Sequence, residues 1–292
     1  MLYLLLISII FASLNSVVLH KADLSNGNTV YKINMIVSAV WFFVLFAVNG
    51  FKISISSPAL IWGIVYGVTQ TLFILFKTLA MNSGPVSVTT LIGNMSLVVS
   101  VFFCFFVWQE AIAASDIIGL AVLMLGTVLT TYKNKKDGKK ISRKWIIYSI
   151  FFLIFAASVG ISFKAFGKTG HSDVAGDMMI IASFVMLFLY FIICLLTSKK
   201  SRHLSETCLE NKLNKTLIIY SLLSGVLSCG YNRLNIYLTS TMSAVVFFPS
   251  FNGGVVLLST VLSIIILREK ITLKSFVGIM LGLAGICIIG IL

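Results

Sequence analysis

The stretch LREKITLKSFVGIMLGLAG, residues 267–285, repeats the pattern of an earlier stretch, WQEAIAASDIIGLAVLMLG, residues 108–126. Each stretch has a short link with one glutamate, followed by an apolar span dotted with glycine. One offset of 159 residues (267 minus 108) superimposes identical residues throughout this part of the two halves: Leu79/Leu238, Val86/Val245, Ser100/Ser259, Glu110/Glu269, Ile112/Ile271, Gly119/Gly278 and Gly126/Gly285. The sequence therefore predicts an internally duplicated protein.

The composition places this duplicated chain in a membrane. Hydrophobic residues make up 59% of it and charged residues 11%, with a mean hydropathy of +1.05, far from the usage of a soluble domain. Lipid offers no partner for backbone amides, so each segment that crosses it must be helical. With about 20 apolar residues needed per span, the sequence predicts an all-α integral membrane protein with ten transmembrane helices, at residues 1–19, 29–50, 59–80, 86–107, 115–132, 144–166, 174–197, 217–239, 243–266 and 272–291.

The repeat and the polar links together suggest three parts. Residues 1–132 form a first five-helix repeat, residues 133–143 a basic linker, and residues 144–292 a second five-helix repeat. The first apolar run lacks a basic leader and a small-residue cleavage site, so we interpret it as a span rather than a signal peptide. We expect a multi-pass protein of a cell membrane, of the bacterial inner (plasma) membrane type.

The net charge of +13 is distributed unevenly over the links between spans. The odd-numbered links carry 17 Lys and Arg residues, whereas the even-numbered links carry only Lys52, Lys164 and Lys168. The positive-inside rule then predicts cytoplasmic odd links and external termini. Because the basic residues flank membrane spans, we expect membrane lipid rather than nucleic acid as their partner.

Two segments carry a resemblance to a known family. The stretches FPSFNGGVVLLS, residues 248–259, and GPVSVTTLIGN, residues 84–94, each lead into one of the two glutamate links quoted above. With the length and the duplication, they resemble EamA-type members of the drug/metabolite transporter (DMT) superfamily. The resemblance implies two five-helix halves of inverted topology, a substrate cavity lined by the first four helices of each half, and fifth and tenth helices at the periphery.

The chain departs from the family pattern in two respects. The Trp-Gly pair often found in the family's first helix is absent, and the corresponding region reads FASLNSV, residues 11–17. Family members of known orientation usually keep both termini inside, whereas the charge count here predicts termini outside.

Polar residues recur on single faces of four predicted spans. Tyr66, Gln70 and Lys77 share a face of the third span, at helical spacing. Similar stripes are Ser8 and Asn15 in the first span, Ser87, Thr90 and Asn94 in the fourth, and Tyr220, Ser224, Tyr231 and Asn235 in the eighth. Such residues either line a wet cavity or hydrogen-bond between helices. We predict a substrate site and choose as candidates Asn15, Tyr66, Gln70, Lys77, Thr90, Asn94, Tyr231, Asn235, Arg233, Ser250 and Asn252.

Two basic residues, Lys77 and Arg233, lie inside predicted spans, and no acidic residue lies at comparable depth. Cations that line a cavity attract anionic or zwitterionic ligands. The alternative is that both side chains extend to the headgroups, since each is about two turns from a span end.

Pro249, followed by Gly253 and Gly254, lies early in the ninth predicted span. Proline removes a helical hydrogen bond, so we expect this helix to be kinked or locally unwound and to act as a hinge. Glu110 and Glu269 lie at span boundaries. We expect a helix cap or an ion pair within a link, for example with Arg268 or Lys270, rather than a proton-coupling role.

The remaining residues give no sign of enzyme, metal or cofactor chemistry. The histidines and cysteines lack metal-ligand spacing, and no phosphate-binding glycine loop is present. We therefore predict a secondary transporter that exports a small polar metabolite, such as an amino acid or organic acid, by alternating access. The alternatives are a cation or drug exporter and a non-transporting membrane scaffold. The partners that we expect are a small-molecule substrate and lipid, and a homodimer is left open.

Overall fold

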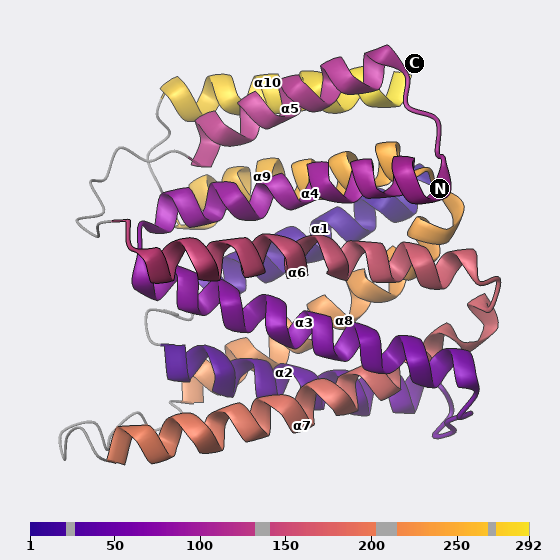
Figure 1. Cartoon of the computed structure of the whole chain (residues 1–292), viewed down its shortest axis with the longest axis vertical. Helices are drawn as coiled ribbons and strands as arrows, with labels where there is room; N and C mark the ends of the chain where they lie inside the picture. Colours follow the sequence, from indigo (N-terminus) through magenta and orange to yellow (C-terminus); the bar gives the residue numbers. More distant parts are fainter. Residues whose placement is uncertain (22–26, 132–140, 203–214, 268–272, 292) are drawn as a thin grey trace.

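The computed structural model describes residues 1–21, 27–131, 141–202, 215–267 and 273–291, which fold into α-helices and one short 3₁₀ turn (Figure 1). The prediction of an all-α protein is confirmed. The elements are α1 (Leu2–Lys21), α2 (Gly27–Val48), α3 (Ser57–Ser83), α4 (Val86–Trp108), α5 (Ala114–Thr131), α6 (Arg143–Lys168), η1 (Ser172–Val174), α7 (Ala175–Arg202), α8 (Lys215–Thr241), α9 (Ala244–Leu267) and α10 (Leu273–Ile291).

Side-chain caps mark two of these helix starts. The Ser56 hydroxyl accepts a hydrogen bond from the Ala59 N–H, and Pro58 occupies the first turn of α3. The Ser142 hydroxyl likewise accepts from the Trp145 N–H at the start of α6. Short polar links therefore end the apolar runs close to the predicted positions.

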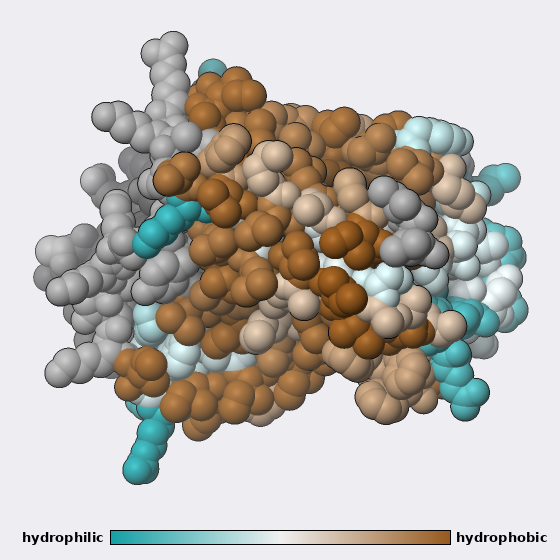
Figure 2. All heavy atoms as spheres, turned by 90° about the horizontal axis from the view of Figure 1, so that it is seen from above, coloured by the Kyte–Doolittle hydropathy of each residue, from teal (hydrophilic) through white to brown (hydrophobic). Residues whose placement is uncertain are grey.

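Seven of the described helices are long and apolar enough to cross a membrane. They are α1, α2, α3, α4, α6, α7 and α9. The described apolar segments of α5 and α10 are shorter, and polar residues interrupt α8. Figure 2 shows a broad apolar flank with hydrophilic residues toward both ends of the bundle, as expected for a protein embedded in lipid.

The helices of the two halves contact each other in matching pairs. Helix α2 packs on α7, α4 on α9 and α5 on α10, and these pairs occupy the same position in each half. Helix α1 packs on α8 and α9, while α6 packs on α3 and α4, the corresponding helices of the first half. In Figure 1, α5 and α10 lie together at one edge of the bundle, beside α4 and α9.

Successive helices run in opposite directions, so the links alternate between two ends of the bundle. The end that carries the start of α1 and the links 49–56, 109–113, 169–174 and 242–243 lies at the right in Figure 1 and is named here the even-link end. The opposite end is named the odd-link end.

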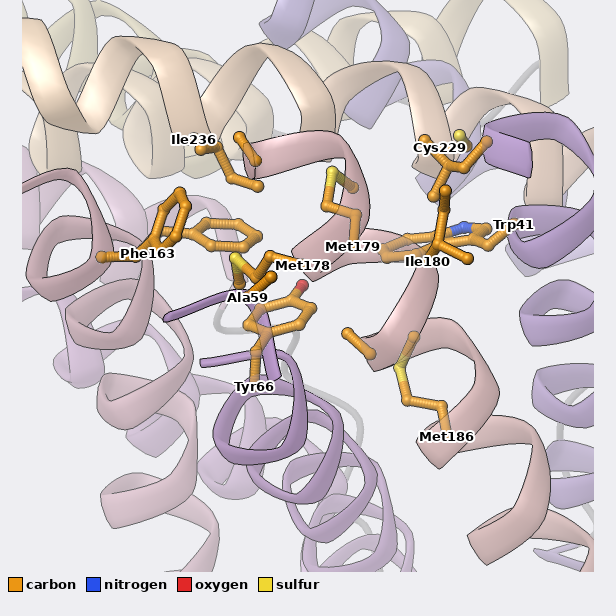
Figure 3. Close-up of a cluster of buried hydrophobic side chains, with 14 of the residues drawn as sticks. Trp41, Ala59, Tyr66, Phe163, Met178, Met179, Ile180, Met186, Cys229 and Ile236 are labelled. Carbon is orange, nitrogen blue, oxygen red and sulfur yellow. The ribbon is translucent and has the colours of Figure 1, made fainter. Parts of the chain in front are cut away.

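Two apolar clusters lie toward the even-link end. The first joins α2, α3, α6, α7 and α8 around Tyr66, Phe163 and Met178 (Figure 3). The second joins α1, α4, α8 and α9 around Leu5, Cys104 and Phe248. Helices α1, α3, α7 and α9 contribute mainly from their N-terminal halves, and α4, α6 and α8 mainly from their C-terminal halves, so both clusters lie nearer this end of the bundle.

Helices α5 and α10 approach until their backbones touch. A Cβ atom added at Gly126 would lie 2.5 Å from the Gly282 nitrogen, and one at Gly285 would lie 2.6 Å from the Leu123 nitrogen. Real Cβ atoms essentially never approach so closely, so glycine is required at these positions.

Helix α9 corrects one expectation. It runs as a continuous helix from Ala244 to Leu267 with Pro249 inside it, so the predicted local unwinding is absent. Its glycines have packing roles, because a Cβ at Gly253 would lie 2.6 Å from Leu123 and one at Gly254 would lie 2.8 Å from Ile9. A hinge at Pro249, Gly253 and Gly254 stays a prediction.

Candidate substrate-binding site

The polar stripe of α8 is used for contacts between helices. The Ser8 hydroxyl donates to Asn235 Oδ1 at 2.6 Å, and the Ser224 hydroxyl donates to Asn15 Oδ1 at 2.6 Å. Further along α8, Tyr66 donates to Asn232 Oδ1 at 3.1 Å and Trp41 Nε1 to Ser228 Oγ at 2.7 Å. In this conformation Asn15, Tyr66 and Asn235 therefore hold α1 and α3 against α8.

Among the described residues, three other buried side-chain atoms have no hydrogen-bond partner: Gln70 Oε1 on α3, Asn94 Nδ2 on α4 and Ser149 Oγ on α6. We name these residues the α3–α4–α6 polar group. A buried donor or acceptor without a partner costs about 1–3 kcal/mol, and such atoms usually signal a bound water or a functional role. Gln70 and Asn94 were predicted to bind substrate. Their free atoms distinguish them from the paired residues of α8.

The aromatic ring of Phe152 connects the three helices of the polar group. It stacks on Phe73 of α3 with ring centroids 5.7 Å apart, and a Cβ added at Gly93 of α4 would lie 2.7 Å from it. Each member of the polar group lies within one helical turn of one of these contacts, since Gln70 precedes Phe73 by three residues, Asn94 follows Gly93 and Ser149 precedes Phe152 by three. The three residues therefore lie at a similar level of the packed helices α3, α4 and α6.

Lys77 lies on the same face of α3, one turn beyond Phe73. Its ammonium lies 5.8 Å from the centroid of the Phe73 ring, a distance compatible with a cation–π interaction. The described residues place no carboxylate within salt-bridge distance of it. A positive charge thus lies beside the polar group, and its half-buried side chain lies toward the odd-link end of α3.

The other predicted residues are not brought to this region by any described contact. Thr90 donates to the Val86 carbonyl of its own helix at 3.0 Å, and Asn252 donates to the Phe248 carbonyl at 3.0 Å. Tyr231 is half-buried, with its ring 6.1 Å from Phe251, and Ser250 is buried in α9.

Arg233 is exposed, and its guanidinium lies close to Gly176 at the start of α7. The alternative interpretation, in which this side chain extends to the membrane surface, fits its exposure. Ser149 was missed by the sequence interpretation, because a single hydroxyl in an apolar span gives no periodic signal. Its place beside Asn94 follows from the packing of α6 on α4.

A buried ion pair lies at the even-link end. Glu110 Oε1 lies 2.9 Å from Lys164 Nζ and 3.5 Å from Lys168 Nζ, while Glu110 Oε2 accepts the Ala244 N–H at 2.7 Å. Lys164 Nζ also donates to the Met242 carbonyl at 2.6 Å. The predicted helix cap is thus found for Glu110, and its ion pair is made outside its own link.

The ion-pair partner differs from expectation. It is Lys164 of α6, and Arg268, Glu269 and Lys270 lie outside the described residues. The sequence could not show this pair, because its members belong to opposite halves. Burial acts to raise the pKa of Glu110, but the Ala244 N–H and Lys164 together outweigh it and hold the pKa below its ordinary value. Glu110 is therefore ionised at neutral pH.

A bundle of apolar helices with an apolar flank and hydrophilic ends is the architecture of a multi-pass membrane protein. The profile of the EamA-like transporter family matches residues 143–291, half of the chain. The protein belongs to this family and is a membrane transporter of the DMT type. The predicted family is thereby confirmed.

Comparison with solved structures supports the fold. One crystal structure, titled only "Crystal structure of protein", has a TM-score of 0.70 at 12% sequence identity, covering 98% of this chain and 94% of that chain. No curated protein matches the sequence significantly.

Proposed function

We propose that this protein is a secondary transporter that exports a small, polar, carboxylate-bearing metabolite by alternating access. The observation that supports the proposal is the α3–α4–α6 polar group with Lys77 beside it. A transporter must bind its substrate by groups that are otherwise short of partners, and three such atoms occur here between packed helices.

The chemistry of the polar group suggests a class of substrate. Lys77 supplies positive charge for a carboxylate, and the free Asn94 Nδ2 donates to an oxygen. Gln70 Oε1 accepts a hydrogen bond from an ammonium or hydroxyl, and the Ser149 hydroxyl can do either. An amino acid or a hydroxylated organic acid offers these features together.

The arrangement of the halves supports the mechanism. Each contact that α1 makes in the second half has a counterpart made by α6 in the first, which is the relation that two inverted five-helix repeats produce. We therefore propose that all ten helices cross the membrane, in repeats at residues 1–132 and 144–292 joined by the basic linker. Rocking of one repeat against the other would expose the polar group to each side in turn.

Two features support export: the positive charge of the odd links and the apolar packing at the even-link end. The basic odd links are proposed to lie in the cytoplasm. Lys77 lies toward that end of α3, whereas the apolar clusters close the even-link end. An anionic substrate would thus enter from the cytoplasm in the described conformation.

A cation exporter is disfavoured by the acidic residues that the structure describes. Glu110 is ion-paired, and Asp177 accepts from Asn49 Nδ2 at 2.8 Å and from the Ser54 N–H at 3.2 Å. Of the other described acidic residues, Asp116 accepts the Ala113 N–H at 2.9 Å, and Asp173 is exposed in η1, outside the long helices. The described residues therefore place no free carboxylate inside the bundle for an organic cation.

The test is a thermal-shift screen of the detergent-solubilised protein against amino acids, organic acids and organic cations. A ligand at one hundred times its dissociation constant stabilises the native state by about 2.7 kcal/mol. Hits are then assayed for counterflow in liposomes. We expect hits with a carboxylate and a loss of both signals in Asn94→Leu. Preference for cations would indicate a drug exporter, and a protein that neither binds nor moves any solute would indicate a scaffold.

A further inference from the structure

We infer that Glu110 and Lys164 form a latch that keeps the even-link end closed and must open in each transport cycle. The inference rests on the proposed alternating access. Its starting point is the position of the ion pair, which joins the two halves of the chain at the end where the apolar clusters lie.

The contacts of the latch cross between the halves. Glu110 belongs to the link between α4 and α5, in the first half. Its three partners, Lys164, Lys168 and the Ala244 N–H, all belong to the second half. Lys164 also donates to the Met242 carbonyl in the link between α8 and α9. One carboxylate thus ties the first half to both α6 and the start of α9.

The two charges of the latch are shielded from water, so each depends on the other for compensation. The Lys164 side chain is 4% exposed and that of Glu110 11%, so the pair is shielded from water. Each charge is also satisfied by a backbone group, at 2.7 Å for Glu110 and 2.6 Å for Lys164. A buried pair with one partner removed is strongly destabilised, because the other charge stays buried without compensation.

Residues next to the latch belong to the two apolar clusters. Phe163 precedes Lys164 and stacks on Tyr66 of α3 with centroids 4.4 Å apart. Cys104 of α4 lies six residues before Glu110 and is fully buried in the second apolar cluster. Movement of Glu110 away from Lys164 therefore separates the surfaces that close this end.

The odd-link end differs from the even-link end. There α4 begins after Pro85 with no side-chain cap, although α9, its counterpart in the other half, begins with the Glu110 cap. The described contact between α4 and α6 at that end is neutral, from Trp145 Nε1 to Thr89 Oγ1 at 3.0 Å. Among the described residues, the inter-half ion pairs thus lie at the closed end alone.

The test uses Cys104 as a reporter of opening. In a protein with the other four cysteines replaced by serine, a hydrophilic maleimide is applied to proteoliposomes or detergent-solubilised protein without substrate. We expect Glu110→Gln and Lys164→Met each to raise the Cys104 labelling rate at least about tenfold, since tenfold corresponds to only ~1.4 kcal/mol in a two-state equilibrium. The matched control is Asp116→Asn, because Asp116 lies just beyond the same link and bonds only to Ala113 within it.

The design also covers variants that fail to fold. The double variant Glu110→Gln/Lys164→Met leaves no buried charge without a partner, since the Lys168 side chain is 48% exposed to water. It should therefore fold and label as fast as either single variant. Equal labelling of wild type, latch variants and the Asp116→Asn control overturns the inference. Because no substrate is present, that outcome leaves the proposed transport untouched. Absence of solute binding in the screen above would instead refute transport without changing the labelling result.

Discussion

Asn94 and Asn235 each place an amide in an apolar helix, Asn235 buried and Asn94 partly buried with its Nδ2 atom inaccessible, yet the structure predicts opposite consequences for the same substitution. Asn94 Nδ2 has no hydrogen-bond partner, whereas Asn235 Oδ1 accepts the Ser8 hydroxyl at 2.6 Å. Leucine matches asparagine closely in shape. The pair of variants Asn94→Leu and Asn235→Leu therefore tests which amide is structural and which is reserved for a ligand.

The magnitudes follow from the contacts. Asn94→Leu removes a desolvated donor whose lack of a partner costs about 1–3 kcal/mol, so the free energy of unfolding should stay equal or rise. Asn235→Leu removes a bond worth about 0.6 kcal/mol on average in membranes and leaves the Ser8 hydroxyl only its longer contact with the Tyr231 carbonyl, at 3.4 Å, for a loss of about 1 kcal/mol. For ligand binding, the lost bond from Asn94 to a charged group is worth about 1.5–3 kcal/mol, or about ten- to a hundredfold in affinity.

The measurements are unfolding of each purified variant in mixed micelles and ligand affinity from the thermal shift. We expect Asn94→Leu to be as stable as wild type and to bind at least about tenfold more weakly. Asn235→Leu should lose stability and keep most of its affinity once folded. A destabilised Asn94→Leu variant with unchanged affinity would refute the reasoning, since it would assign Asn94 to packing.

Four further predictions concern charge, packing, orientation and pH. Lys77→Gln should weaken the binding of anionic ligands at least about tenfold more than that of neutral ligands, as measured by the thermal shift, and Lys77→Arg should keep part of the affinity for anions. An unchanged preference would support the interpretation in which the lysine extends to the headgroups. Gly126→Ala should destabilise the protein by about 1–3 kcal/mol in the unfolding assay, because its Cβ meets the backbone of α10, and a smaller loss is expected for Gly176→Ala, where the nearest atom belongs to a side chain. A cysteine placed at Lys144 should resist impermeant thiol reagents on intact cells, and labelling from outside would reverse the proposed orientation. The lowered pKa of Glu110 means that its stabilisation of the latch is complete above the ordinary carboxyl pKa and is lost as pH falls through the lowered pKa. Because maleimide reacts with the thiolate, Cys104 labelling is divided at each pH by that of the Glu110→Gln variant; this ratio should be constant from about pH 8 to pH 6 and approach one only in stronger acid.

The sequence predicted the helices well because each apolar run is bounded by polar links. The starts of α3 and α6 lie beside Ser56 and Ser142, whose capping roles are local. It also identified the polar faces, including those of Gln70 and Asn94. Periodicity shows which residues share a face, and it does not show what lies opposite.

Contacts between residues far apart in the chain could therefore not be predicted from the sequence. The sequence alone did not distinguish Asn235, which pairs with Ser8, from Asn94, which has a free donor. The pairing of Glu110 with Lys164 depends on how α6 meets the link before α5. Pro249 was expected to unwind α9, but it lies in the second turn, and the rest of the helix continues without interruption.

The contact between α5 and α10 explains why the duplication is still readable in this chain. A methyl group added at Gly126 or Gly285 meets main-chain atoms of the opposite helix, and so does one at Gly119 or Gly278. A clash with a side chain can be relieved by a second substitution, but main-chain atoms are common to all residues and no substitution removes them. Any side chain at these four positions therefore forces the two helices apart, whatever residues surround it. Two of the matched pairs, Gly119/Gly278 and Gly126/Gly285, are thus fixed by the same physical constraint on both helices.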